Sequence, residues 1–292
     1  MKRLTVLLGA VLCVTLPAAA QIPGSLRSNL AAASRPQDTE VGLALLDLGS
    51  GDSLWSNALW RVHAASTMKV PVLIELAQRV DAGDFRWDSP VLVRNEFHSI
   101  VDGSVYHLAS EPVLDSLEGQ LIPARFLAEL MITRSSNFAT NLLVADLGAP
   151  RIQATARRLG ADSIVVLRGV EDQKAFDRGL SNTTTARDLA VLLAAIAQGR
   201  AASEASTAVM LEILSHQEFR DGIPAGVPPG TRVASKTGNI TGINHDAAVI
   251  FPPGRPPYVL VILTKGFASP SAAESYMAGV SREAWQALVG VP

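Results

Sequence analysis

The chain has 292 residues, of which 48% are hydrophobic and 18% are charged, and its formal net charge is −2. This composition is ordinary for a globular protein and excludes a largely disordered chain. The sequence contains no basic run of the kind that binds nucleic acid, so we expect its partner to be a small molecule or a cell-envelope polymer.

Residues 1–20 have the pattern of a secretory signal. Lys2 and Arg3 precede an apolar stretch over residues 4–16, and small residues end at Ala20 before Gln21. About 13 apolar residues are fewer than the ~20 that a membrane-spanning helix needs. We therefore predict cleavage near Ala20-Gln21, no stable membrane insertion afterwards, and a periplasmic or secreted protein.

The only cysteine of the chain, Cys13, lies inside this predicted signal. The mature protein would then contain no cysteine and could form no disulfide, although it is exported. Lipid attachment at Cys13 is a weaker alternative, because Leu12 before it is bulkier than such sites usually accept. Removal of Lys2 and Arg3 leaves 23 basic and 27 acidic side chains, a net charge of −4.

The sequence after the signal begins as a sheet and continues as helices. Residues 41–48 (VGLALLDL) predict a strand, residues 49–52 a turn, and residues 54–60 the returning arm of a hairpin. From residue 68 the apolar spacing is helical. Five helices are predicted, over residues 68–80, 124–132, 138–147, 151–159 and 184–197.

Strand patterns return near the end, over residues 231–236, 245–251 and 258–264. Ser271 and Glu274 form a capping-box pattern for a last helix that runs to about residue 287. We predict an α/β (α+β) fold: an antiparallel sheet from the N- and C-terminal segments, flanked by helices, with an inserted helical subdomain. Residues 21–292 would form one domain, its α/β part over 21–64 and 205–292 and its helical part over 65–204.

A serine and a lysine stand one helical turn apart at the start of an apolar run, "HAASTMKVPVLIEL" (residues 63–76). If Ser66 opens the helix, Lys69 lies on the same face and close to it. Serine becomes a strong nucleophile when a neighbouring base takes its proton, and a lysine can do so when burial or a second cation lowers its pKa. As an isolated match, however, this pattern more often marks a capped helix with a lysine that reaches solvent.

Two further patterns occur once each: Ser135-Ser136-Asn137 after a predicted helix, and Lys236-Thr237-Gly238 at the end of a predicted strand. A Ser-x-x-Lys pattern, a Ser-Asp-Asn pattern and a Lys-Thr-Gly pattern together are the signature of class A β-lactamases and penicillin-binding proteins. From about Val41 to Ala287 the chain resembles class A β-lactamases, most closely in "MITRSSNFATNLL" and "GTRVASKTGNITGINHDAAVI".

The resemblance implies a sheet-plus-helical-insert fold with the active site in the cleft between the two parts. Ser66 would be acylated by a lactam carbonyl after Lys69 helps to remove its proton, and Ser135 would pass a proton to the departing lactam nitrogen. The resemblance also implies which residues bind the substrate: Asn137 would bind the substrate's side-chain amide, and Lys236 and Thr237 would bind its carboxylate. Gly238 would let the strand approach closely. The N–H groups of Asn239 and Ser66 would form the oxyanion hole.

Release of the acyl group in class A enzymes needs a glutamate that holds a water on an Ω-shaped loop. Glu171 is the best candidate here and Asp172 the competitor; a solvated loop acid is the alternative to both. The loop departs from the family pattern, since Ala175 replaces the asparagine that helps to hold the water, and Asn182 replaces an aspartate that pairs with the loop arginine. We expect Arg168 to pair with Asp177 instead.

One further departure lies in the second motif, where Ser136 replaces the usual aspartate; this puts support of the fold in doubt more than proton transfer. The five histidines are scattered and form no zinc spacing, so we expect no metal and no cofactor. Tyr106 could line the mouth of the cleft, although packing is its more common role.

Three functions remain open at this point. The first is a periplasmic or secreted, monomeric serine β-lactamase that hydrolyses penicillins or cephalosporins and confers antibiotic resistance. The second is a penicillin-binding peptidase that acts on D-Ala-D-Ala ends of peptidoglycan. The third is a non-catalytic envelope sensor or binding module that keeps the pocket.

Overall fold

A computed structural model describes residues 21–26, 36 and 38–290 of the chain. The predicted signal and Cys13 lie outside these residues. The central feature is a five-stranded sheet in the order β2-β1-β11-β10-β9, in which all neighbours are antiparallel. Its strands are β1 (Glu40–Asp47), β2 (Ser53–Ser56), β9 (Arg232–Ile240), β10 (Ile243–Phe251) and β11 (Tyr258–Lys265). The strands therefore come from the two ends of the chain, as the sequence predicts.

The middle strand, β11, explains the most apolar run of the sequence. Its residues 258–264 are all buried, because β11 lies between β1 and β10 and both faces of the sheet are covered. Strand β9 forms the edge, and its residues 236–239 carry the third motif. An edge strand leaves one row of backbone N–H and C=O groups unpaired, so β9 can present them to a ligand.

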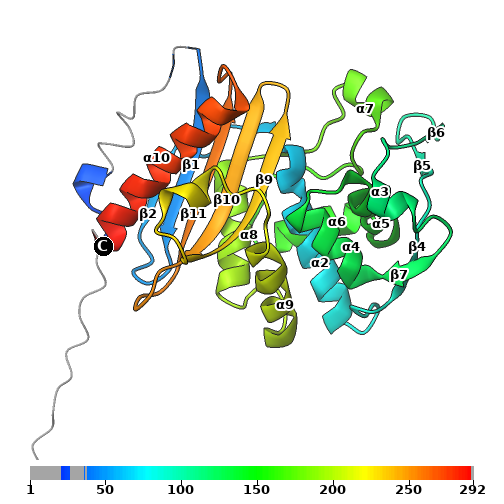
Figure 1. Cartoon of the computed structure of the whole chain (residues 1–292), viewed down its shortest axis with the longest axis horizontal. Coiled ribbons are helices and arrows are strands. Elements are labelled where there is room, and N and C mark those ends of the chain that lie inside the picture. Colours follow the sequence, from blue (N-terminus) through cyan, green and yellow to red (C-terminus); the bar gives the residue numbers. More distant parts are fainter. Residues whose placement is uncertain (1–20, 27–35, 37, 291–292) are drawn as a thin grey trace, which may run out of the picture.

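Two layers of helices cover the sheet (Figure 1). Helix α10 (Pro270–Leu288) packs on one face with the short 3-10 helix η2 (Ile223–Gly226). Helix α8 (Ala186–Ala197) packs against the strands from the other face, between the sheet and the helical part. The strands alternate accordingly: Leu43 and Leu45 belong to the core beneath α10, whereas Ala44 belongs to the larger core on the α8 side.

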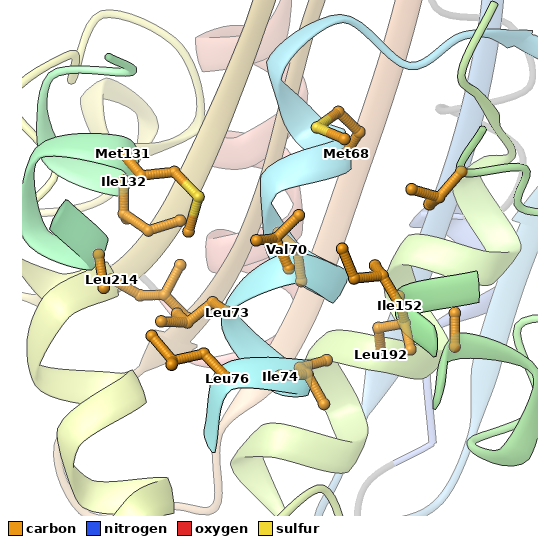
Figure 2. Close-up of a cluster of buried hydrophobic side chains, with 14 of the residues drawn as sticks. Met68, Val70, Leu73, Ile74, Leu76, Met131, Ile132, Ile152, Leu192 and Leu214 are labelled. Carbon is orange, nitrogen blue, oxygen red and sulfur yellow. The ribbon is translucent and has the colours of Figure 1, made fainter. Parts of the chain in front are cut away.

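Helix α2 (Lys69–Asp81) is the central element of the helical part. It is buried from residue 69 to residue 77, and its apolar side chains reach neighbours on every side. Figure 2 shows Leu73 and Leu76 toward Met131, Ile132 and Leu214 on one side, and Ile74 toward Ile152 and Leu192 on the other. The surrounding helices are α4 (Ala124–Thr133), α5 (Asn137–Leu147), α6 (Ala149–Arg158) and α9 (Glu204–Ser215). A helix with apolar side chains on every side is buried over that length, and α2 thereby fixes the position of η1, the 3-10 helix before it, which carries Ser66.

The remaining elements are short. They are the 3-10 helix η1 (Ala65–Met68), the helices α3 (Pro112–Asp115) and α7 (Gln173–Asp177), and the two-stranded pairs β3 (Val62–His63) with β8 (Thr183–Thr184), β4 (Pro90–Leu92) with β7 (Leu121–Pro123), and β5 (Phe97–His98) with β6 (Val105–Tyr106).

The structure differs from the sequence prediction in several details. Helices α7 and α9 were not predicted, and β9 continues to Ile240, beyond the predicted end at residue 236. Strand β2 is shorter than predicted and ends at Ser56. The capping box at Ser271 is wrong, because the N-cap of α10 is Ser269, whose hydroxyl accepts a hydrogen bond from the N–H of Ala272. Pro270 follows Ser269 and takes the first helical position, which suits a residue without an N–H.

Within the described residues, no helix combines the length and the apolar character needed to span a bilayer.

Candidate active site

Ser66 lies in η1, at the point where this 3-10 helix leads into α2. The residue before it, Ala65, has a left-handed backbone (φ 45°), and its N–H donates to Nδ1 of His63 at 3.0 Å. Strand β9 passes close by: a Cβ atom added to Gly238 would lie 3.0 Å from Cγ2 and 3.1 Å from the backbone N of Thr67. Glycine in the third motif therefore lets the edge strand approach the nucleophile.

The amine of Lys69 is fully buried and surrounded by the second motif. Its Nζ donates to the carbonyl oxygen of Ser135 at 2.6 Å, to Oδ1 of Asn137 at 2.8 Å and to Oγ of Ser135 at 3.1 Å. Burial lowers the pKa of Lys69 well below its usual value, and the nearby charge of Lys236 lowers it further. The site thus favours a neutral amine, the form that can act as a base.

Lys236, from β9, is also fully buried, and its Nζ donates to Oγ of Ser135 at 3.1 Å and to the carbonyl oxygen of Thr237 at 2.9 Å. Burial lowers the pKa of Lys236 to about 7, against the opposing charge of Asp246. The hydroxyl of Ser135 therefore lies between two buried amines from different parts of the chain. A hydroxyl with this environment can relay a proton in either direction.

Helix α5 begins directly after Ser135, and an acidic side chain that the sequence analysis missed holds its first turn. Glu111 accepts hydrogen bonds from the N–H of Asn137 (2.9 Å), the N–H of Phe138 (3.0 Å) and the hydroxyl of Ser136 (2.5 Å). Ser136 also caps the helix by accepting from the N–H of Ala139. The doubt about fold support at Ser136 is answered by these contacts, because Glu111 supplies a carboxylate at the helix N-terminus, where a negative charge is stabilising.

The side chain of Glu171 faces the same centre. Its Oε1 accepts a hydrogen bond from Nδ2 of Asn137 at 2.6 Å, so that Asn137 links Glu171 to Lys69. Asp172 is engaged elsewhere: it accepts from Oγ of Ser99, from the N–H of Ile100 and, as the N-cap of α7, from the N–H of Ala175. These hydrogen bonds lower the pKa of Asp172 although its burial acts in the opposite direction. The carboxylate of Glu171 therefore faces the site, whereas the carboxylate of Asp172 is used to hold the loop and to cap α7.

Backbone contacts rather than an ion pair hold the loop that carries Glu171. Oδ1 of Asn182 accepts from the N–H of Leu167 at 2.8 Å, and its Nδ2 donates to the carbonyl oxygen of Arg168 at 2.9 Å. The expected pairing of Arg168 with Asp177 is wrong: the guanidinium donates to the carbonyl oxygens of Leu180 and Gly169 instead. Asn182 thus closes the base of the loop without a charge.

A second asparagine, also missed in the sequence, fixes the residue before Glu171. Asn141, on α5, accepts from the N–H of Val170 at 2.6 Å and donates to its carbonyl oxygen at 3.0 Å. The hydroxyl of Tyr106 donates to the same carbonyl at 3.2 Å, so Tyr106 supports the loop. A Cβ atom at Gly169 would lie 2.3 Å from Oδ1 of Asn141, so only glycine leaves this contact undisturbed.

Two cavities meet at Ser66, Asn137 and Asn239, which line both of them. The first, of about 360 Å³, continues past Glu171 and Phe176. The second, of about 290 Å³, continues along the edge of β9. Its walls include Ser135, Thr237, Gly238 and Asn239. The structure therefore brings all nine predicted site residues to one cleft between the sheet and the helices. Among the described residues, no group of three or more His, Cys, Asp or Glu is arranged to hold a metal ion.

In this arrangement Ser66 shares a cavity with a second serine, Ser135, whose hydroxyl lies between two buried amines. It is the arrangement of an acyl-transferring serine hydrolase. The chain matches the model of the Beta-lactamase enzyme family over residues 25–288, and it therefore belongs to this family. It is 29% identical over 268 residues to a beta-lactamase of Streptomyces fradiae, a match that covers 88% of this chain and 83% of that protein.

Two solved structures are similar over almost their whole length. A beta-lactamase from Sphaerobacter thermophilus DSM 20745 has a TM-score of 0.83 and 28% identity, with 93% of this chain and 99% of that chain covered. The structure of PBP-A has a TM-score of 0.79 and 28% identity, with 94% and 98% covered. These likenesses confirm the predicted fold class.

Proposed function

We propose that the protein is a class A serine β-lactamase, a hydrolase of cyclic amides that opens the lactam of penicillins or cephalosporins through an acyl-enzyme on Ser66. One observation carries the proposal: a continuous hydrogen-bonded chain runs from Lys236 through Ser135, Lys69 and Asn137 to Glu171. This chain supplies groups for both halves of a hydrolysis, acylation of the serine and release of the acyl group.

In the acylation half, Oγ of Ser66 attacks the lactam carbonyl carbon as Lys69 takes its proton. The N–H groups of Ser66 and Asn239 stabilise the oxyanion. The C–N bond then breaks, and the lactam nitrogen takes a proton from the hydroxyl of Ser135, which is replenished from the amines on either side of it. Lys236 and Thr237 hold the substrate carboxylate meanwhile: Thr237 lines the second cavity, and the buried amine of Lys236 lies next to it, at Oγ of Ser135 and the carbonyl oxygen of Thr237.

In the release half, Glu171 acts as the general base for a water that attacks the ester carbonyl. Both Glu171 and Asp172 line the first cavity with Ser66, and their hydrogen bonds distinguish them. Among the described residues, the carboxylate of Glu171 takes one hydrogen bond, from Asn137. The oxygens of Asp172 instead accept three hydrogen bonds from Ser99, Ile100 and Ala175.

The decisive experiment follows the intact mass of the protein through its reaction with a penicillin and with a cephalosporin. We expect rapid turnover by the native protein, and accumulation of an acyl adduct by Glu171→Gln with kcat lowered about 10³-fold, the scale of a lost general base. Asp172→Asn serves as the matched control: it should lower the melting temperature, because it weakens a helix cap, and still release the acyl group.

Other outcomes would contradict the proposal in distinct ways. Hydrolysis by the native protein no faster than by Ser66→Ala would refute a β-lactamase. A stable adduct on the native protein with little turnover would indicate a penicillin-binding peptidase, and no adduct at all would indicate a binding module. Unchanged turnover in Glu171→Gln would remove Glu171 from the mechanism.

Export and a monomeric state complete the proposal. A secretory signal over residues 1–20 would bring the enzyme to the compartment where β-lactams act, where it would confer resistance. The proposed reaction uses side chains, backbone N–H groups and water, and it needs no cofactor.

A further inference from the structure

The second cavity has an acidic wall that the proposed mechanism does not use. Beyond Thr237 the cavity is lined by Asp221, from the loop before η2, by Asp246 of β10 and by Glu274 of α10. Lys and Arg are absent from its lining within the part of the chain that the structure describes. A pocket that adjoins a carboxylate-binding position thus carries three carboxylates of its own.

Two buried side chains on the floor of this cavity have an oxygen without a partner. In the register of the sheet, Asn244 lies opposite Asn239 and Asp246 opposite Thr237, so these four residues share one face. Asn244 and Asp246 are 5% and 0% exposed, and both line the cavity. Oδ1 of each accepts no hydrogen bond from any described residue, while Oδ2 of Asp246 accepts from the N–H of Ile223. Buried acceptors of this kind normally have a donor, and the described residues supply none here. The two oxygens therefore add uncompensated negative charge density beneath the cavity.

The two carboxylates on the rim are also available. The side chains of Asp221 and Glu274 take part in no hydrogen bond or ion pair with other described residues, and Asp221 is exposed. Of the basic groups nearby, burial lowers the pKa of His245 to about 4, which leaves it neutral. Arg220 is exposed and outside the lining, although its charge acts on Asp246. Lys236 points to the opposite face of β9 and donates to Ser135.

We propose that this cavity is a subsite for a cationic substituent next to the carboxylate of the substrate, so that β-lactams with a positive charge at that place are preferred. The inference rests on the proposed function, because it takes the substrate carboxylate to lie at Lys236 and Thr237. In a cephalosporin the carboxylate at C4 and the substituent at C3 are on neighbouring carbons. The substituent therefore extends from Thr237 toward Asp221 and Glu274.

The apolar lining narrows the kind of cation. Phe219, which is 50% exposed, and Met277 line the cavity together with the carboxylates. A flat aromatic cation such as pyridinium can contact an aromatic ring and a thioether while its charge faces the carboxylates. A small ammonium ion would leave this apolar surface uncovered. The structure therefore fits a pyridinium better than a primary amine.

Cephaloridine and cephalothin provide the matched probes, since they share the thienylacetamido side chain and differ at C3, where one carries a pyridinium and the other a neutral acetoxy group. Binding is measured by calorimetry in the Ser66→Ala background, so that the result does not depend on turnover. We expect cephaloridine to bind about fivefold more tightly, the scale of two carboxylates several ångströms from a cation at high dielectric. The preference should shrink as salt is raised.

The variant Asp221→Asn/Glu274→Gln tests the assignment in the same background. In this double variant the two probes should bind with about equal affinity. The variant Glu274→Lys should bind cephalothin more tightly than cephaloridine. Asp162→Asn is the charge-matched control, because Asp162 is exposed and does not line the cavity. It should keep the preference of its parent.

Three results would overturn the subsite: no preference in the parent, a preference that survives in the double variant, or no binding of cephaloridine. Selective binding by Ser66→Ala with no hydrolysis by the native protein would instead support the subsite and refute the proposed function. With an active native enzyme, the ratio of kcat/KM for the two probes should show the same order as binding.

Discussion

The substitution Glu111→Gln tests whether a carboxylate from outside the three motifs organises the second one. Glu111 accepts from two backbone N–H groups at the start of α5 and from the hydroxyl of Ser136. Glutamine keeps the size of the side chain but loses the charge and one acceptor. A hydrogen bond to a charged group contributes ~1.5–3 kcal/mol, and a charge at a helix N-terminus adds ~0.3–1 kcal/mol. We expect a loss of about 2 kcal/mol in the free energy of unfolding, because the charge is lost while the amide oxygen can still accept the two N–H bonds that Oε1 accepts.

This loss corresponds to a fall in melting temperature of about 6 °C for a domain of this size. Glu129→Gln is the control, because Glu129 pairs with Arg125 on the surface of α4 and such pairs contribute ~0.3–0.5 kcal/mol. A melting temperature for Glu111→Gln equal to that of Glu129→Gln would refute the cap.

A second measurement separates the effect on the site from the effect on stability. The negative charge of Glu111 raises the pKa of Lys69, against the larger lowering by burial and by Lys236. Its removal therefore lowers the pKa of Lys69 further. If the neutral amine is the active base, the acid limb of the pH profile of kcat/KM moves to lower pH in Glu111→Gln. A shift to higher pH would contradict this assignment of charge.

A double-mutant cycle completes the test. Ser136→Asp restores the residue usual in the family but places a second carboxylate against Glu111, so it should destabilise the protein. The same change in the Glu111→Gln background should recover stability, because the new aspartate can then cap α5 alone. Additive effects of the two substitutions would show that they do not share the cap.

Two further predictions concern the loop and the pH range. Gly169→Ala should lower kcat about tenfold or more, because the new Cβ displaces the side chain of Asn141 and with it the loop before Glu171. Gly279→Ala is the control and should leave kcat unchanged, because a Cβ at Gly279 has open space around it. Native kcat/KM should fall as the pH rises through and above about 7, since Lys236 loses the proton that attracts the substrate carboxylate, whereas Lys236→Arg keeps its charge and should flatten this alkaline limb. An equal fall in kcat for Gly279→Ala would contradict the role given to Gly169. An alkaline limb of kcat/KM that is unchanged in Lys236→Arg would contradict the role given to the charge of Lys236.

Local patterns predicted much of the fold. The strands of the sheet and helix α2 follow from apolar runs and from helical periodicity, because burial dictates both. Helix α9 was missed because two of its five buried positions are the polar residues Ser206 and Thr207, which blur the apolar spacing. Helix α7 was also missed, because it has a single turn and exists through its cap at Asp172. Such a short helix has no periodicity that a sequence could show.

The site was predictable where a motif names the residue, as for Ser66, Ser135 and Lys236. It was not predictable where support comes from a distant segment. Glu111 lies 25 residues before Ser136 on a loop, and nothing in its own neighbourhood marks it as a cap. The prediction for Arg168 failed for the same reason. Its guanidinium donates to backbone carbonyl oxygens, which are present in every sequence and which no sequence pattern marks as partners.

The backbone at the site also depends on distant contacts. Ala65, Ser135 and Glu171 are three of the five non-glycine residues with positive φ in the described chain, at 45°, 56° and 60°. Such a conformation costs ~1–3 kcal/mol and persists only where surrounding contacts enforce it. Three hydrogen bonds enforce it here. The N–H of Ala65 donates to His63, Lys69 donates to the carbonyl oxygen of Ser135, and Asn141 accepts from the N–H of the residue before Glu171. The residues proposed for catalysis therefore lie on or next to backbone in a conformation that the local sequence disfavours. Contacts with the rest of the fold hold them in the positions that the proposed chemistry requires.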